Sequence, residues 1–148
     1  MIASFRGAHG FLSNFALLDP PIRYEGIVYT STEAAFQAAK TLDLDERKVI
    51  AKLSPGQSKK MGSLVKLRPD WEAVKLQVMY DVNWQKYCDL KFAAKLLATA
   101  GHELVEGNDW GDTYWGVCRG IVGDNHLGKI LMRIRDELQD ALDMKHPG

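Results

Sequence analysis

The chain has 148 residues, of which 46% are hydrophobic and 26% are charged, a composition typical of one soluble globular domain. Its nineteen basic and nineteen acidic side chains cancel, which excludes a protein that holds nucleic acid by its overall charge. The sequence lacks both the run of about twenty apolar residues that spans a membrane and the apolar core of a signal peptide. We therefore expect a single domain over residues 1–148, located in the cytoplasm and without a membrane partner.

The first predicted elements are two short strands. Residues 22–24 and 27–29 each contain hydrophobic residues, and turn residues surround them: Asp19-Pro20-Pro21 before the first and Glu25-Gly26 between the two. This pattern predicts a small antiparallel sheet.

Residues 30–40 predict a helix that is apolar on nearly every side yet carries three large polar residues. Glu33, Gln37 and Lys40 fall within an arc of roughly 60° of the helical wheel. Because buried polar groups need partners, this stripe is typical of one wall of a polar site. An alternative for Glu33 is a capping box with Thr30, which has the required spacing.

Helical patterns fill much of the remaining chain. We expect helices at residues 44–53, after Ser54 and Pro55, over a long stretch after Asp70, at residues 89–98 with Gly101 closing it, and at residues 127–142. Three of the four tryptophans are expected in the core, namely Trp71, Trp84 and Trp110.

The segment from Glu103 to Gly128 is rich in glycine, aspartate, asparagine and aromatic residues, which is typical of a functional loop. Asp112, Tyr114 and Trp115 lie close together there, and Gly116 would let the backbone approach a ligand beside the indole ring. The alternative is a surface loop that a buried tryptophan anchors.

Residues 123–130 come within one residue of a phosphate-binding P-loop but have Ile130 where a Ser or Thr should bind magnesium. The position late in the chain also argues against a nucleoside triphosphatase. Two interpretations remain, an ordinary helix start or a helix N-terminus that binds a diphosphate.

Cysteine and histidine positions argue against metal and thiol chemistry. Cys88 and Cys118 form no CxxC pair, which indicates a reducing compartment, and no histidine close in sequence marks Cys118 as a nucleophile. Metal-ligand spacing is absent among the four histidines, which are His9, His102, His126 and His146. We expect no metal and no cofactor.

The longest stretch of one charge sign contains Lys59, Lys60, Lys66 and Arg68. Such a stretch is typical of a solvated face. The hypothesis of a nucleic-acid-binding protein rests on these residues alone.

Five motifs, in order, resemble those of the NADAR (YbiA-like) family from about Phe5 to Leu138. They are Phe11–Phe15, Ser31–Glu33 with Phe36–Lys40, Asp70-Trp71, Asp112–Gly116, and Asn125–Gly128 followed by Ile130-Leu131-Met132 and Arg135. One departure is Ala34, because many members carry histidine directly after the motif glutamate.

The resemblance implies a compact, mostly helical α+β single domain with a small antiparallel sheet. It also implies an N-glycosidase that cleaves ADP-ribosyl or ribose-phosphate compounds, with removal of ADP-ribose from guanine bases as the first expectation. Carried onto matching positions, Glu33, Lys40 and Asp112 are the catalytic candidates. The ligand-contact candidates are Arg6, Gly7, Asn14, Phe15, Gln37, Trp71, Tyr114, Trp115, Gly116, Asn125, Leu127 and Gly128.

The expected partner is an ADP-ribose-like ligand, carried by DNA or RNA in the first expectation. Two alternatives are a module that binds NAD or ADP-ribose without chemistry, and a hydrolase of riboflavin-pathway intermediates. The sequence does not define an oligomeric state.

Overall fold

The computed structural model describes residues 1–145, so His146 lies outside the described residues. Contacts along the chain divide it into two compact units. The central unit comprises residues 14–86, and the terminal unit comprises residues 1–13 together with the described residues from Tyr87 onward. The single domain over residues 1–148 stays a prediction.

The central unit begins with the predicted β-hairpin. Strands β1 (Ile22–Tyr24) and β2 (Ile27–Tyr29) pair antiparallel. Glu25 and Gly26 form the turn, with φ angles of 46° and 86°. Left-handed conformations at both central residues are what a two-residue hairpin turn of type I′ requires.

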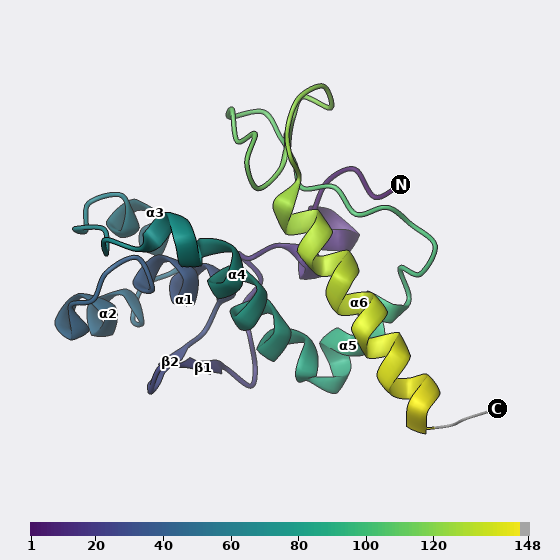
Figure 1. Ribbon diagram of the computed structural model, residues 1–148, viewed down its shortest axis with the longest axis horizontal. Coiled ribbons are helices and arrows are strands. Elements are labelled where there is room, and N and C mark those ends of the chain that lie inside the picture. Colours follow the sequence, from purple (N-terminus) through teal and green to yellow (C-terminus); the bar gives the residue numbers. More distant parts are fainter. Residues whose placement is uncertain (146–148) are drawn as a thin grey trace. The chain divides into compact units, whose positions relative to one another are not determined.

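Three short helices follow in the central unit and pack against one another: α1 (Thr32–Ala38), α2 (Leu44–Ile50) and α3 (Pro55–Gly62) (Figure 1). Ser54 caps α3 as predicted: its hydroxyl accepts a hydrogen bond from the Gln57 amide, and the Gln57 side chain accepts one from the Ser54 amide. This reciprocal capping fixes where α3 begins.

Helix α4 (Trp71–Cys88) is the predicted long helix. Asp70 directly precedes it, and the Asp70 carboxylate accepts two hydrogen bonds from Arg68, at 2.6 and 3.1 Å. The helix buries Val78, Met79 and Val82. These three side chains therefore place one face of the helix in the core.

The terminal unit contains one 3₁₀ helix, two α-helices and two very short strands. These are η1 (Gly7–Leu12), α5 (Leu90–Leu97), β3 (Gly107–Asn108), β4 (Val117–Cys118) and α6 (His126–Lys145). Helix α5 packs against both η1 and α6 (Figure 1). The expected mostly helical α+β fold with a small antiparallel sheet is confirmed, while η1 and the parallel β3–β4 pair were not predicted.

Arg135 of α6 fixes the segment that follows α5. Its Nη1 donates to the backbone oxygens of Thr99 and His102, at 2.9 and 2.8 Å, and to the Thr99 hydroxyl at 3.0 Å. Hydrogen bonds from a charged donor are stronger than neutral ones. This motif residue therefore has a structural role.

A buried amide network joins the start of the central unit to α1 and α4. Asn14 Oδ1 accepts hydrogen bonds from the Thr32 hydroxyl at 2.8 Å and from Asn83 Nδ2 at 3.2 Å. Its Nδ2 donates to the Met79 sulfur at 3.4 Å, and its backbone oxygen accepts from the Glu33 amide at 3.1 Å. The predicted ligand contact Asn14 thus uses its side chain to hold α1 and α4 together.

Replacing Asn14 should therefore destabilise the fold. We expect Asn14→Ala to lower the free energy of unfolding by about 1–3 kcal/mol, because the buried Thr32 and Asn83 groups lose their shared acceptor. Gln77→Ala is a matched control, since Gln77 bonds Asp81 on the exposed side of α4, and such a substitution changes stability by about 0.5 kcal/mol or less. Urea unfolding measures both, and equal stability of the two variants would contradict this structural role.

Candidate functional site

Helix α1 is buried along its whole length, and Ser31 defines its start. The Ser31 hydroxyl accepts a hydrogen bond from the Ala34 amide at 3.0 Å. The alternative of a capping box between Thr30 and Glu33 is therefore wrong, because the cap lies one residue later, at Ser31. Glu33 becomes an interior residue of the first turn, and its carboxylate is not required for capping.

Glu33 and Gln37 form a hydrogen-bonded pair on one face of α1. Gln37 Nε2 donates to Glu33 Oε1 at 2.8 Å. The exposed fractions of the two residues are 7% and 4%. Burial of a carboxylate is costly unless it is hydrogen-bonded, and Gln37 supplies one such hydrogen bond to Glu33 in the interior.

Lys40 lies just beyond the end of α1 and is half-buried. Its Nζ lies 5.7 Å from the centre of the Phe36 ring. Burial lowers the pKa of Lys40 below the ordinary value; the negative charge of Glu33 opposes this shift, and the positive charge of Lys59 reinforces it. At a given pH, Lys40 is consequently the neutral, nucleophilic amine in a larger fraction of molecules than an exposed lysine is.

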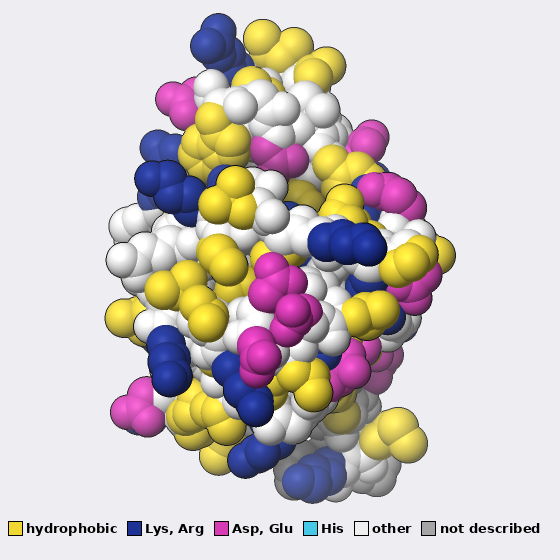
Figure 2. Space-filling model, turned by 90° about the vertical axis from the view of Figure 1, so that its left-hand side faces the viewer, with side chains coloured by type: hydrophobic (Ala, Val, Ile, Leu, Met, Phe, Trp, Pro, Cys, Tyr) yellow, Lys and Arg dark blue, Asp and Glu magenta, His cyan; other side chains and the backbone are white. Residues whose placement is uncertain are grey.

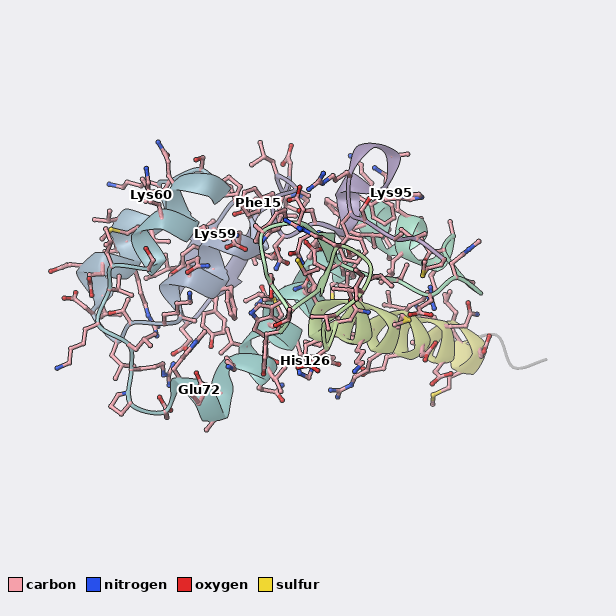
Figure 3. All side chains as sticks on the ribbon, turned by 90° about the horizontal axis from the view of Figure 1, so that it is seen from above. Phe15, Lys59, Lys60, Glu72, Lys95 and His126 are labelled. Carbon is pink, nitrogen blue, oxygen red and sulfur yellow. The ribbon has the colours of Figure 1, made fainter. Side chains whose placement is uncertain are left out.

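Two aromatic ligand candidates of the central unit differ in exposure. Trp71 is buried, and its ring packs on Phe36 with centroids 5.1 Å apart. Phe15 is 46% exposed and lies beside α3, where a Cβ built on Gly56 would be 4.0 Å from Phe15 Cε2 (Figure 3). Trp71 is therefore part of the hydrophobic core, whereas the Phe15 ring is accessible to a ligand.

Asp112, the catalytic candidate of the terminal unit, organises its own loop. Its Oδ1 accepts hydrogen bonds from the amides of Tyr114 at 3.1 Å and Trp115 at 2.9 Å. The Asn108 side chain in turn bonds the backbone N–H and oxygen of Asp112. Asx turns of this kind fix loop geometry, so Asp112 Oδ1 stabilises the loop through these two hydrogen bonds.

The loop places Tyr114 and Trp115 in a half-buried aromatic cluster with His126 of α6. The rings of Tyr114 and Trp115 meet edge to face with centroids 4.8 Å apart, and the Tyr114 and His126 centroids are 4.4 Å apart. The sequence reasoning did not single out His126, although it lies inside the fifth motif. Contacts with the Tyr114 and His126 rings hold one side of the Trp115 indole ring in place.

The start of α6 is not the free anion site that the glycine-rich segment suggested. The backbone N–H groups of residues 124–127 donate to the backbone oxygens of residues 113–116, at 2.8–3.3 Å. The side chain of Asn125 also bonds Leu104 and Glu106 backbone groups. Of the two interpretations, the diphosphate site is therefore wrong and the ordinary helix start is correct, because backbone oxygens of the loop already accept hydrogen bonds from these amides.

Three further ligand candidates near this loop are explained by packing. A Cβ on Gly116 would overlap the Glu106 backbone oxygen, and one on Gly128 would overlap that of Leu104. Leu127 is buried. These glycines allow close contact between protein segments, not the ligand approach that the sequence suggested for Gly116.

Arg6 and Gly7 lie at the start of η1, where both are exposed. The Arg6 guanidinium lies 5.9 Å from the centre of the Trp110 ring. Trp110 is 54% exposed, so its expected place in the core is wrong. An exposed arginine next to an indole ring is suited to an anionic or aromatic group.

The terminal unit also contains a cavity of about 500 Å³ that none of the predicted site residues lines. Its walls include Ile2, Phe11 and the basic residues His9, Lys95 and His102. Lys95 Nζ lies 5.8 Å from the centre of the Phe11 ring.

The basic stretch of α3 and the segment after it does not form one continuous patch. Lys59, Lys60 and Lys66 are exposed, and Arg68 is engaged by Asp70. Figure 2 shows Lys and Arg side chains dispersed among acidic and hydrophobic ones on the side where Figure 1 draws α2 and α3. This arrangement favours the solvated face over a nucleic-acid surface.

Within residues 1–145, no group of three or more His, Cys, Asp or Glu side chains is placed to hold a metal ion. Cys88 and Cys118 are free thiols. No helix in this part of the chain is both long and apolar enough to cross a membrane.

The site residues therefore fall into two sets, each within one unit. The central unit brings Glu33 and Gln37 of α1 together with Lys40, which follows the end of that helix. The terminal unit brings together the Asp112 loop and the start of α6.

Comparison with known proteins gives consistent results. The sequence model of the family described as the NADAR domain matches residues 4–139 of this chain. The N-glycosidase YbiA of Escherichia coli K12 is 38% identical over 136 residues, covering 88% of this chain and 82% of that protein. An N-glycosidase of Nostoc punctiforme is 30% identical over 142 residues, covering 92% and 90%.

One further relative and one solved structure also match this chain. A riboflavin biosynthesis protein of Vibrio vulnificus is 33% identical over 136 residues, which cover 89% of this chain but 36% of that protein. The solved structure of E. coli YbiA has a TM-score of 0.82 and 36% identity, covering 99% of this chain and 87% of that one. The predicted enzyme class, a hydrolase that acts on N-glycosyl bonds, is confirmed by the N-glycosidase relatives. With its domain match, its relatives and its fold in agreement, the chain belongs to the NADAR family.

Proposed function

We propose that this chain removes ADP-ribose from guanine bases of nucleic acid by hydrolysing the N-glycosidic bond. The observation that carries the proposal is the buried pair of Glu33 and Gln37, with the half-buried Lys40 just beyond the end of the same helix. A carboxylate and a lysine of lowered pKa are the groups that this reaction needs.

The chemistry follows from the charge that develops at the sugar. Breaking a ribosyl C–N bond builds positive charge on the anomeric carbon, which a nearby carboxylate stabilises. Glu33 would also take a proton from the attacking water, whose oxygen joins the anomeric carbon. The departing base nitrogen gains a proton, so the reaction is a hydrolysis without net electron transfer.

Lys40 has two alternative roles in this reaction. As an ammonium group it would pair with the diphosphate and with Glu33. As a neutral amine it would attack C1 of the ring-opened ribose, which is then an imine to the base. The C1–N bond to the base breaks as the Schiff base with lysine forms, and the base nitrogen leaves with a proton. Water then hydrolyses the Schiff base to free ADP-ribose and regenerates the lysine.

A second candidate substrate class is a riboflavin-pathway intermediate. The similarity to the riboflavin biosynthesis protein of Vibrio vulnificus supports it. It requires the same bond cleavage at a ribosyl carbon, so Glu33 and Lys40 would keep their roles. The non-catalytic binding module finds no support among the N-glycosidase relatives.

Incubation with guanine-ADP-ribosylated DNA tests the substrate directly. We expect free ADP-ribose and unmodified DNA, both detected by mass spectrometry. Stoichiometric binding without release would contradict the proposal, and turnover of riboflavin-pathway intermediates alone would favour the second candidate.

Glu33→Gln should nearly abolish turnover, by a factor on the order of 10²–10⁴, because an amide cannot act as a base. The variant should keep its melting temperature and ligand affinity, since the amide preserves the shape of the side chain. Glu72→Gln is the matched control, because Glu72 is exposed and pairs with Lys75 (Figure 3). Equal turnover of the two variants would remove Glu33 from the mechanism.

Borohydride trapping separates the two roles of Lys40. On the covalent route, reduction during turnover should leave an ADP-ribosyl adduct on the Lys40 peptide, and Lys40→Arg should abolish both adduct and turnover. Because the pKa of Lys40 is lowered, adduct formation should begin at a lower pH than for an exposed lysine and should rise with pH as the amine loses its proton. Lys60→Arg, on the exposed surface of α3, controls for general labelling. An active Lys40→Arg enzyme without an adduct in the parent would rule out the covalent route.

A further inference from the structure

Gly62, the last residue of α3, is a buried glycine that the sequence reasoning did not single out. Its backbone lies outside the left-handed region, which Gly7, Gly26 and Gly101 do adopt. An L-residue could therefore take the same backbone conformation. The reason for glycine at this position must lie in the space that a side chain would need.

Gln37 occupies that space. A Cβ built on Gly62 would overlap Gln37 Oε1 and would lie 2.8 Å from Gln37 Cδ and 3.0 Å from Gln37 Cβ. Contact would thus extend along the side chain and would not be limited to its tip. Because Gln37 is only 4% exposed, its carboxamide cannot move into solvent without disturbing the packing.

The Gln37 carboxamide depends on this contact for its position. Its Nε2 donates to Glu33 Oε1, while its buried Oε1 accepts no hydrogen bond from any group of residues 1–145. Only one end of the amide is therefore held by a hydrogen bond. The other end is held by packing against the bare Cα of Gly62.

We infer that Gly62 is a positioning residue for Glu33, acting through Gln37. The missing side chain leaves room for the Gln37 carboxamide in the one place from which Nε2 reaches the Glu33 carboxylate. A methyl group at residue 62 displaces the carboxamide, breaks the Nε2–Oε1 hydrogen bond and leaves the carboxylate misplaced. The catalytic part of this inference rests on the proposed function, whereas the packing part does not.

Helix α3 offers a matched control at Gly56. There a Cβ would have its nearest contact 4.0 Å away, at Phe15 Cε2, which is an ordinary van der Waals distance. Gly56→Ala and Gly62→Ala therefore make the same chemical change in the same helix, but only the second meets Gln37.

A double-mutant cycle tests the inference. Gly62→Ala should lower turnover by about tenfold to a hundredfold, because misplacement of a reacting group by about 1 Å costs that much. Gly56→Ala should stay within about twofold of the parent. In a Gln37→Ala background, which has no carboxamide to displace, Gly62→Ala should cause little further loss. Losses that add in full would show a general structural role and overturn the inference.

Melting temperature and the NMR signal of the Gln37 side-chain amide give readouts that do not need catalysis. If Gly62→Ala fails to fold, the Gln37→Ala/Gly62→Ala double variant should recover a cooperative melting transition, and a double variant that stays unfolded would overturn the inference. In a folded Gly62→Ala protein, an unchanged Gln37 amide signal would also overturn it. If the parent protein cleaves no N-glycosyl bond, the proposed function fails, while these two readouts still decide the packing claim.

Discussion

The burial of α1 on every side is the constraint on which the rest of the central unit depends. A helix that places Glu33 and Gln37 in the interior needs hydrogen-bond partners for both side chains, and the two bond each other. The same burial fixes the helix start, because the amide of Glu33 bonds Asn14 and the hydroxyl of Ser31 caps the first turn. Fold stability and the candidate catalytic carboxylate therefore share one set of hydrogen bonds.

The terminal unit relies on close backbone contact instead. The amides of residues 124–127 and the oxygens of residues 113–116 satisfy each other, which joins the Asp112 loop to the start of α6. Such contact requires glycine where a side chain would collide with another backbone segment, as at Gly116 and Gly128. A loop built in this way holds the ring of Trp115 in a fixed place, which a binding surface needs.

Much of the fold could be predicted because its signals are local. The turn at Glu25-Gly26, the cap at Ser54 and the apolar periodicity of α6 each involve residues only a few positions apart. The stripe of Glu33, Gln37 and Lys40 was found for the same reason.

Features that depend on contacts between distant segments could not be predicted. The hydrogen-bond acceptors of the amides at the start of α6 are backbone carbonyl groups of the loop. Every residue has such a group, so no residue type in the sequence marks the acceptors. Nothing in the sequence near Gly62 marks it, because its close contact is with Gln37, which lies 25 positions away in the chain.

The most direct test of the central role of Glu33 is a crystal structure of Glu33→Gln with an uncleaved guanine-linked ADP-ribosyl nucleotide. We expect the anomeric carbon to lie nearest to residue 33 and Lys40 Nζ, and an anomeric carbon bound instead beside Lys95 or Asp112 would contradict that role.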